Sequence, residues 1–247
     1  LLLLGSTVNT RYVEQIINIT QTTSASYLLL SSLDISRRNL ALRGHESFEK
    51  VSSMAEYARS EINSIGGYYA YGRDIVNGGS IYDFDVTKLS VYTRDMGLTG
   101  IEVYDLLRDE YDIQIEFGDI GNILAYISIG DRIQDIERLV GALEDIKRLY
   151  SKPVSRLHNA EYITPIVAAT PQKAFYSEKK LIPIRESAGR ICGEFVMCYP
   201  PGIPILAPGE QITEEIIDYI LYAKEKGCSM QGPEDPDIEK LNVLTDI

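Results

Sequence analysis

The feature that most constrains the fold is an amphipathic segment between Asp131 and Tyr150. Apolar side chains recur there every three or four residues, which places them on one face of an α-helix. They are Ile133, Ile136, Leu139, Val140, Leu143, Ile146 and Leu149. We therefore expect a helix that Asp131 caps at its start. Such a helix has to bury its apolar face, so the chain must supply a sheet or further helices to cover it.

The preceding residues predict that partner. Residues 86–93, 113–117 and 122–129 have the composition of strands, and the turn at 118–121 joins the last two. Between the first two strands, Thr99 stands three residues before Glu102, the spacing of a capping box, and begins a predicted helix through Tyr111. The order of elements is β-α-β-β-α, which indicates an α/β class with a sheet covered by helices on one side.

Residues before this unit have the apolar spacing of helices, and residues after it have a different composition. Residues 10–40 are expected to be helical apart from the polar run at 20–24, and a second helix is expected over 46–65, ending at Gly66 and Gly67. After a polar connection at 151–159, prolines become frequent, short strands flank 182–197, and Thr213 begins a helix through Lys226. The polar connection at 151–159 is therefore a plausible domain boundary.

Composition excludes several classes of function. The 247 residues carry a net charge of −12, which disfavours a nucleic-acid partner because such a surface needs a basic stripe. No apolar run approaches the roughly 20 residues that span a bilayer, so no membrane partner is expected. The three cysteines and two histidines match no metal-site spacing, and no metal is predicted. A reduced, cytoplasmic protein is the simplest interpretation.

Several local sequences resemble one family. ICGEFVMCYPPGIP at 191–204, followed by APGEQIT at 207–213, resembles the C-terminal domain of the Orn/Lys/Arg decarboxylases, which are PLP-dependent enzymes of fold type I. QGPEDP at 231–236 resembles the closing motif of that family, and TTSASY at 22–27 resembles another segment in which the family usually has proline in place of Ala25. The resemblance implies the end of a PLP large domain at 1–66, a small subdomain at 67–152 and an α+β C-terminal domain at 153–247.

The resemblance also implies a function. Members of the family are lyases of polyamine biosynthesis that convert arginine, lysine or ornithine to the amine and carbon dioxide, with pyridoxal 5'-phosphate (PLP) as cofactor, in homodimers or larger assemblies. The cofactor lysine of the family lies in an S-x-H-K motif, which these residues do not contain. The chain is therefore expected to be a C-terminal half that needs an N-terminal half as partner. Alone it is expected to be inactive, and no catalytic residue is assigned to it.

Four residues are candidates for the site. By resemblance, Thr22 and Ser24 contact the PLP phosphate of the neighbouring subunit; the alternative is that their hydroxyls cap a helix. Glu194 and Glu210 flank a proline-rich segment and are candidates to bind the distal cation of a basic amino acid. The alternative is that one is solvated and the other belongs to the cap of the next helix.

Other interpretations stay open at this point. The tyrosines at 68, 69 and 71 either line a cleft or pack in the core. The chain is alternatively a binding or assembly module that has lost its chemistry, or part of a PLP aminotransferase, although the domain after Ser151 argues against the latter. The motifs do not distinguish among arginine, lysine and ornithine.

Overall fold

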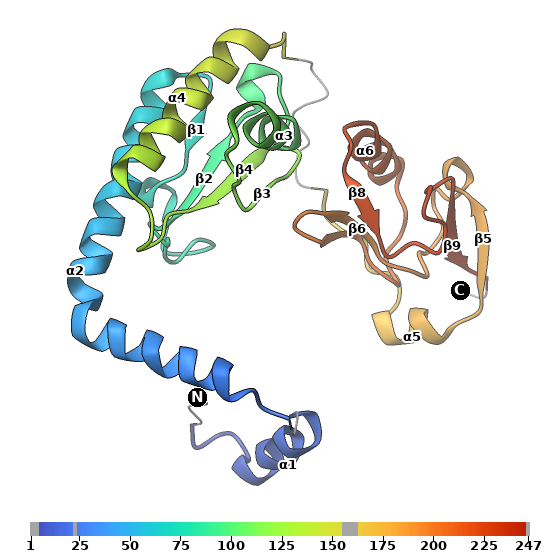
Figure 1. Ribbon diagram of the computed structural model, residues 1–247. Coiled ribbons are helices and arrows are strands. Elements are labelled where there is room, and N and C mark those ends of the chain that lie inside the picture. The colour runs from blue at the N-terminus through green and yellow to red at the C-terminus, as the bar shows by residue number, and fades with distance from the viewer. Residues whose placement is uncertain (1–4, 22–23, 155–162, 246–247) are drawn as a thin grey trace. The chain divides into compact units, whose positions relative to one another are not determined.

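The computed structural model describes residues 5–21, 24–154 and 163–245 (Figure 1). Thr22 lies outside the described residues. The chain divides into two units, residues 1–49 and residues 50–247. Within the described residues, no helix is long and apolar enough to cross a membrane, and no three His, Cys, Asp or Glu side chains are grouped to hold a metal ion.

The first unit is helical. Helix α1 (Thr10–Thr20) is capped by Asn9, whose side chain accepts a hydrogen bond from Tyr12 N at 3.3 Å. Helix α2 (Tyr27–Ile65) follows and continues into the second unit as one helix of 39 residues. The predicted start of a separate helix at Glu46 is therefore wrong. Gly44 is the only strong helix-breaking residue near that point, and its cost of about 1 kcal/mol is small for a helix of this length.

The second unit begins with a four-stranded antiparallel sheet. Its strands are β1 (Tyr69–Ala70), β2 (Lys88–Tyr92), β3 (Phe117–Gly118) and β4 (Asn122–Tyr126), in the order β1-β2-β4-β3. Of the strand predicted at 113–117, only Phe117 belongs to β3. The reason is that Ile113 N donates to Leu107 O at 2.8 Å and so closes the preceding helix instead of pairing in the sheet.

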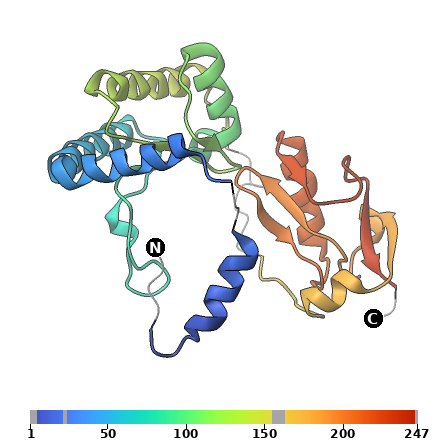
Figure 2. The ribbon, with the colours of Figure 1, turned by 60° about the horizontal axis from the view of Figure 1, so that its bottom comes forward.

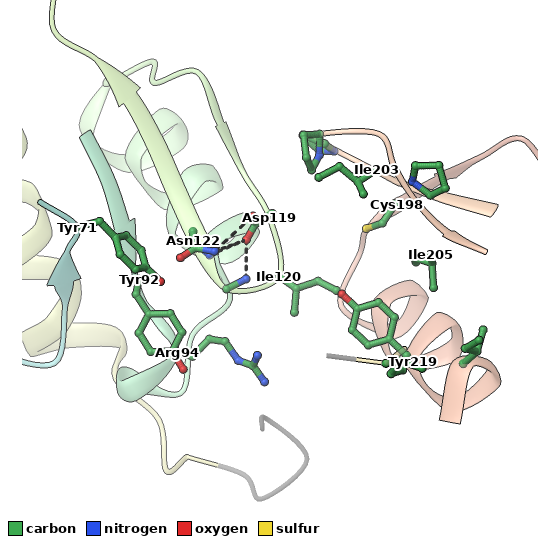
Figure 3. Close-up of a pocket in the computed structure, with 16 residues that line it drawn as sticks. Tyr71, Tyr92, Arg94, Asp119, Ile120, Asn122, Cys198, Ile203, Ile205 and Tyr219 are labelled. Atoms are coloured by element: carbon green, nitrogen blue, oxygen red, sulfur yellow. Dashed lines mark hydrogen bonds between the residues drawn. The ribbon is translucent and has the colours of Figure 1, made fainter. Parts of the chain in front are cut away.

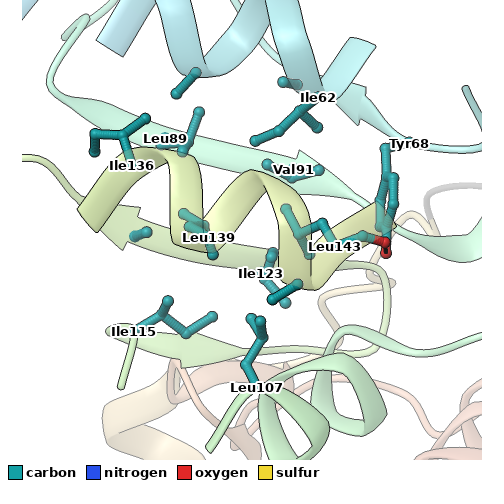
Figure 4. Packing of buried hydrophobic residues seen from close by; sticks show 14 of the residues in the cluster. Ile62, Tyr68, Leu89, Val91, Leu107, Ile115, Ile123, Ile136, Leu139 and Leu143 are labelled. Carbon is teal, nitrogen blue, oxygen red and sulfur yellow. Dashed lines mark hydrogen bonds between the residues drawn. The ribbon is translucent and has the colours of Figure 1, made fainter. Parts of the chain in front are cut away.

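One face of this sheet carries the core. Leu89 is in register with Ala125 and Val91 with Ile123, so these buried side chains lie on the same face. Figure 4 shows apolar side chains of the surrounding helices converging on them, from α2, α3 (Gly100–Tyr111) and α4 (Ile133–Tyr150). The alternation of buried and half-buried residues along β2 and β4 agrees with the predicted one-sided covering.

The sequence predicts the cap of α3 correctly but not the cap of α4. Both halves of the capping box of α3 are present: Glu102 N donates to Thr99 Oγ1 at 3.2 Å, and Thr99 N donates to Glu102 Oε2 at 2.8 Å. Burial alone would raise the pKa of Glu102, but Lys152, 2.7 Å away, and the bonds from Thr99 hold it below its usual value. Asp131 does not cap α4 as predicted, because its carboxylate accepts from Ser128 N in the preceding turn; the cap is Arg132.

We expect Thr99→Ala to lower the free energy of unfolding by about 1–2 kcal/mol, because the variant leaves a helix N–H without its acceptor. The matched control is Glu110→Ala, an exposed position near the end of the same helix, which should change stability by less than about 0.5 kcal/mol. Denaturant titration followed by circular dichroism measures both. Equal effects of the two substitutions would show that the box contributes nothing.

The rest of the second unit forms further strands and helices (Figure 2). They enclose a hydrophobic core of their own. Strands β7 (Ile203–Leu206), β6 (Val196–Tyr199) and β8 (Ser229–Gln231) form one sheet, and β5 (Lys179–Pro183) pairs with β9 (Lys240–Leu244). Helix α5 (Pro171–Tyr176) is short, whereas α6 (Glu214–Glu225) packs Ile216, Ile217 and Ile220 into this core. Thr213 caps α6 as predicted, and Gly227, with a φ of 82°, follows its end.

Candidate functional site

A cavity of about 450 Å³ lies in the described part of the second unit (Figure 3). It lies between the carboxyl end of β2 with the turn before β4 on one side, and the β6–β7 hairpin with α6 on the other. Its size falls within the usual range for small-molecule sites. The lining residues are Tyr71, Tyr92, Arg94, Asp119, Ile120, Gly121, Asn122, Ile163, Cys198, Pro200, Pro201, Ile203, Pro204, Ile205, Ile216 and Tyr219.

The sheet side of the cavity is held by a turn. Tyr92 and Asn122 are paired in register and stand on the face of the sheet opposite the core. Asp119 Oδ1 accepts hydrogen bonds from Gly121 N at 2.7 Å, from Asn122 N at 2.6 Å and from Asn122 Nδ2 at 3.3 Å. These bonds fix both the turn and the orientation of the Asn122 amide.

Arg94 supplies the positive charge. It opens the 3-10 turn η2 (Arg94–Met96), directly after β2, and Figure 3 shows its guanidinium extending from the sheet side into the cavity. Its position depends on Gly121, because a Cβ at that residue would lie 3.2 Å from Arg94 Cδ. The shielded Arg94 Nε and Asn122 Oδ1 have no hydrogen-bond partner within the part of the chain that the structure describes.

The opposite wall is mostly apolar. Pro201, Ile203 and Ile205 come from the β6–β7 hairpin, and Ile216 and Tyr219 from α6. Burial raises the pKa of Tyr219 to about 12, and burial also raises the pKa of Tyr71. Both phenols therefore stay protonated near neutral pH and can donate hydrogen bonds. The site combines one cation, one carboxylate, neutral hydroxyls and an apolar wall.

The residues predicted from the motifs are not among the described residues that line the cavity. Ser24 is exposed and precedes α2 in the first unit, while Thr22 is not described, so their contact with a phosphate stays a prediction. Glu194 is 9% exposed; its Oε1 accepts from Asn242 N at 2.8 Å, and its Oε2 accepts from Glu234 N at 2.9 Å and Asn242 Nδ2 at 3.0 Å. These contacts favour a structural carboxylate that ties β9 to the QGPEDP segment. A substrate contact for Glu194 remains a prediction that its surroundings do not favour.

The carboxylate of Glu210 is also used in a hydrogen bond within the chain. Its carboxylate accepts from Ala207 N at 2.8 Å and so closes the turn in which Gly209 stands. That glycine has a φ of 93°, and a Cβ there would lie 2.2 Å from Ala169 O, which explains why the APGE sequence needs glycine. Glu210 is not among the residues that line the cavity, and its contact with a substrate stays a prediction.

The cavity residues were mostly missed from the sequence. Tyr71 belongs to the tyrosine group that was considered for a cleft, and it does line the cavity, whereas Tyr68 is buried with its hydroxyl on Leu143 O at 2.9 Å. Arg94, Asn122 and Tyr219 were not singled out. The turn Gly118–Gly121 was the available signal, because a glycine-rich turn between strands often brings backbone close to a ligand.

The described residues do not by themselves form a PLP site. PLP needs an amine for its aldehyde and an anion site for its phosphate. Arg94 suits an anion, but no lysine is among the described residues that line the cavity, and Asp119 places a negative charge nearby. No step through the cofactor follows from these residues.

Comparison with solved structures defines the class of fold. The chain is similar to the lysine decarboxylase of Francisella novicida, with a TM-score of 0.74 and 19% identity over 96% of this chain and 46% of that one. The constitutive lysine decarboxylase of Escherichia coli gives a TM-score of 0.69 and 18% identity over the same shares. The mixed helix-and-sheet fold is therefore that of the matching region of these decarboxylases.

Sequence comparison gives the family. Residues 152–236 match the model of the Orn/Lys/Arg decarboxylase C-terminal domain, so the chain carries a domain of that family, and the resemblance stated from its motifs is confirmed. The chain is 41% identical to an arginine decarboxylase of Bacillus subtilis over 94% of its length, and 38% identical to one of Bacillus anthracis over 96%. It spans about half of these relatives, 48% and 49% respectively.

Proposed function

We propose that this chain is the C-terminal part of a PLP-dependent decarboxylase of basic amino acids, and that arginine is its substrate. The observation that carries the proposal is the similarity to proteins named arginine decarboxylase along 94–96% of the chain. Similarity to proteins named lysine decarboxylase is 35% over 30% of the chain in Pseudomonas aeruginosa, which favours arginine.

The proposal includes an N-terminal partner segment. The relatives are about twice as long as this chain, and PLP bound in the whole enzyme would supply the electron sink for loss of carbon dioxide. This chain would contribute the wall of the substrate site, through Arg94, Asn122 and the tyrosines of the cavity, and Thr22 and Ser24 would contact the phosphate across a homodimer. By itself it would be inactive. A cytoplasmic location and a role in polyamine synthesis are part of the same proposal.

The surface of the first unit supports a partner. Large apolar side chains are exposed along the first turns of α2, with Tyr27 at 85%, Leu28 at 84% and Leu33 at 67%. Apolar side chains clustered in this way usually mark a surface that another chain or segment covers. We propose that the covering partner is the N-terminal part of the enzyme, together with a second subunit.

The test is a chimera in which the N-terminal half of the Bacillus subtilis relative is joined to this chain at the aligned boundary. We expect the chimera to release carbon dioxide from arginine at least tenfold faster than from lysine or ornithine, and we expect this chain alone to release none. The intact Bacillus subtilis enzyme is the positive control. A soluble chimera that binds PLP but decarboxylates none of the three would contradict the proposal. Formation of a keto acid would favour the aminotransferase alternative.

A further inference from the structure

We propose that Cys198 and Cys228 are a modification site: a low-molecular-weight disulfide that enters the cavity converts the two thiols reversibly into a disulfide bond. The inference goes beyond the proposed function, because the reaction requires neither PLP nor an N-terminal partner. Disulfides that form in reducing compartments are usually transient and respond to the redox state of their surroundings.

The two thiols are brought together by strand pairing. Cys198 on β6 is directly opposite Met230 on β8, and Cys228 comes two residues before Met230. Residues two apart along an extended chain point to the same side, so both cysteines face the same way. Their side chains pack in one small apolar cluster with Ile120 and Ala223. The Cys228 thiol donates a hydrogen bond to the Cys198 sulfur, which makes the two sulfur atoms neighbours.

The two cysteines differ in access and in acidity. Cys198 is among the residues that line the cavity, and Figure 3 shows its sulfur on the cavity side of the β6–β7 hairpin, whereas Cys228 is not among the described residues that line it. The hydrogen bond from Cys228 lowers the pKa of Cys198, and the same bond raises the pKa of Cys228. Because the thiolate is the nucleophile in disulfide exchange, Cys198 is the thiol that reacts first.

The exchange takes two steps. In the first, the Cys198 thiolate attacks one sulfur of the small disulfide; a bond forms between these two sulfurs, the S–S bond of the reagent breaks, and its other half leaves as a thiolate that takes up a proton. In the second, Cys228 loses its proton to solvent, attacks Cys198 Sγ and releases the remaining half in the same way. Two cysteine thiols are oxidised to one disulfide, and one reagent disulfide is reduced to two thiols.

Cys192 serves as an internal comparison. Its side chain is 0% exposed, its thiol donates to Glu194 O at 3.1 Å, and burial raises its pKa to about 12. It packs in the larger apolar cluster around α6 and β9, apart from the cluster that holds Cys198 and Cys228. A buried thiol with a raised pKa is a poor nucleophile, so we expect Cys192 to stay reduced.

The experiment treats the fully reduced 247-residue chain with 2-hydroxyethyl disulfide, blocks the remaining thiols with N-ethylmaleimide and maps the peptides by mass spectrometry. We expect one disulfide between Cys198 and Cys228 within the chain, a blocked thiol at Cys192, and recovery of all three free thiols with dithiothreitol. A disulfide that involves Cys192, a disulfide that links two chains, or three thiols still reduced under excess reagent would overturn the proposal.

Thermal unfolding of the oxidised chain checks that the bond fits the native fold. The disulfide closes the loop that carries β7 and α6, so the midpoint of unfolding should rise by about 4 °C or more. A lower midpoint than in the reduced chain would overturn the proposal, because the bond would then distort the fold.

Four variants assign the roles of the thiols. Cys228→Ser keeps a hydroxyl donor but cannot attack, so the reaction should stop at the mixed disulfide of Cys198 with the reagent. Cys228→Ala also removes the donor, and its mixed disulfide should form at least about threefold more slowly than in Cys228→Ser, because the thiolate loses its hydrogen bond. In Cys198→Ser, Cys228 should react at least about tenfold more slowly than Cys198 does in the parent chain. The control is Cys192→Ser, which should form the disulfide at the parent rate.

Circular dichroism of each variant separates loss of a thiol from loss of fold. In folded variants, equal rates for Cys228→Ser and Cys228→Ala, or fast reaction of Cys228 in Cys198→Ser, would overturn the roles given to the two thiols. The same mapping in the chimera repeats the test with the partner half in place. A chimera that decarboxylates arginine but keeps both thiols reduced would overturn the site, and an inactive chimera that forms the bond would contradict the proposed function and keep the site.

Discussion

Replacing Gly100 by alanine is expected to lower the free energy of unfolding by more than about 4 kcal/mol. Gly100 is the first residue of α3 and lies directly against the turn before β4. A Cβ at this position would stand 1.8 Å from Asn122 O and 2.7 Å from Asp119 O, which are backbone atoms that no side-chain rotation can move away. Helix and turn would have to separate, and overpacking of this kind is among the few causes of very large losses.

The control for Gly100→Ala is Gly141→Ala. Gly141 lies in the interior of α4 with nothing within 4 Å of an added Cβ, so alanine there should stabilise the protein by about 0.5–1 kcal/mol. Gly118→Ala probes the same contact from the other side, since its Cβ would lie 2.2 Å from Gly100 O. Chemical denaturation resolves all three. If the free energy of unfolding of Gly100→Ala lay within about 1 kcal/mol of that of the parent protein, α3 would not be packed directly against the turn before β4.

Replacing Arg59 by methionine is expected to lower the free energy of unfolding by about 3–5 kcal/mol. Arg59 is only 4% exposed, yet its guanidinium makes three hydrogen bonds to backbone carbonyls: Nε to Tyr71 O at 2.7 Å, and Nη2 to Val86 O at 2.5 Å and Lys88 O at 3.0 Å. Methionine fills a similar volume but donates nothing, so several acceptors lose their donor in a dry environment. Burial lowers the pKa of Arg59, which nevertheless stays charged because the guanidinium starts so high.

Arg59→Lys and Arg108→Met complete this test. Lysine keeps the charge, but its single ammonium group cannot reach three carbonyls as the planar guanidinium does. We therefore expect Arg59→Lys to lower the free energy of unfolding by about half as much as Arg59→Met. Arg108 is 44% exposed and pairs with Asp105 and Asp109, and its replacement by methionine should cost less than about 1 kcal/mol. Thermal unfolding at one pH and salt concentration allows direct comparison. Similar losses for Arg59→Met and Arg108→Met would mean that the three carbonyls are satisfied in another way.

What could be predicted from sequence was mostly local. The apolar spacing of α4, the capping box of Thr99 and Glu102, and the start of α6 at Thr213 depend on residues within one or two turns, and the structure has all three. The capping role of Asp131 was wrong because Ser128 N competes for the same carboxylate. The strand expected at 113–117 was too long because the helix before it takes the N–H of Ile113. In both cases one polar group could take part in two different local structures, and the sequence does not show which hydrogen bond forms. The group is the Asp131 carboxylate in the first case and the Ile113 N–H in the second.

The cavity could not be predicted in the same way. Arg94 and Asn122 come from neighbouring parts of one sheet, whereas Tyr219 joins them only through the packing of α6, which lies more than 90 residues further along the chain. No spacing along the chain encodes that packing. Glu194 and Glu210 are candidates from sequence because a carboxylate beside a rigid, proline-rich loop can bind the distal cation of a basic amino acid. The structure gives both carboxylates backbone donors, as in the turns and strand connections that such motifs also build.

The alternation of β2 and β4 has a consequence for how this protein can diversify. Leu89, Val91 and Ile123 point to the core, while Tyr92 and Asn122, their neighbours in the same strands, face the cavity. The residues that hold the core and the residues that line the cavity are therefore different positions of one strand. A substitution of Tyr92 or Asn122 changes the lining of the cavity without changing an apolar side chain of the core.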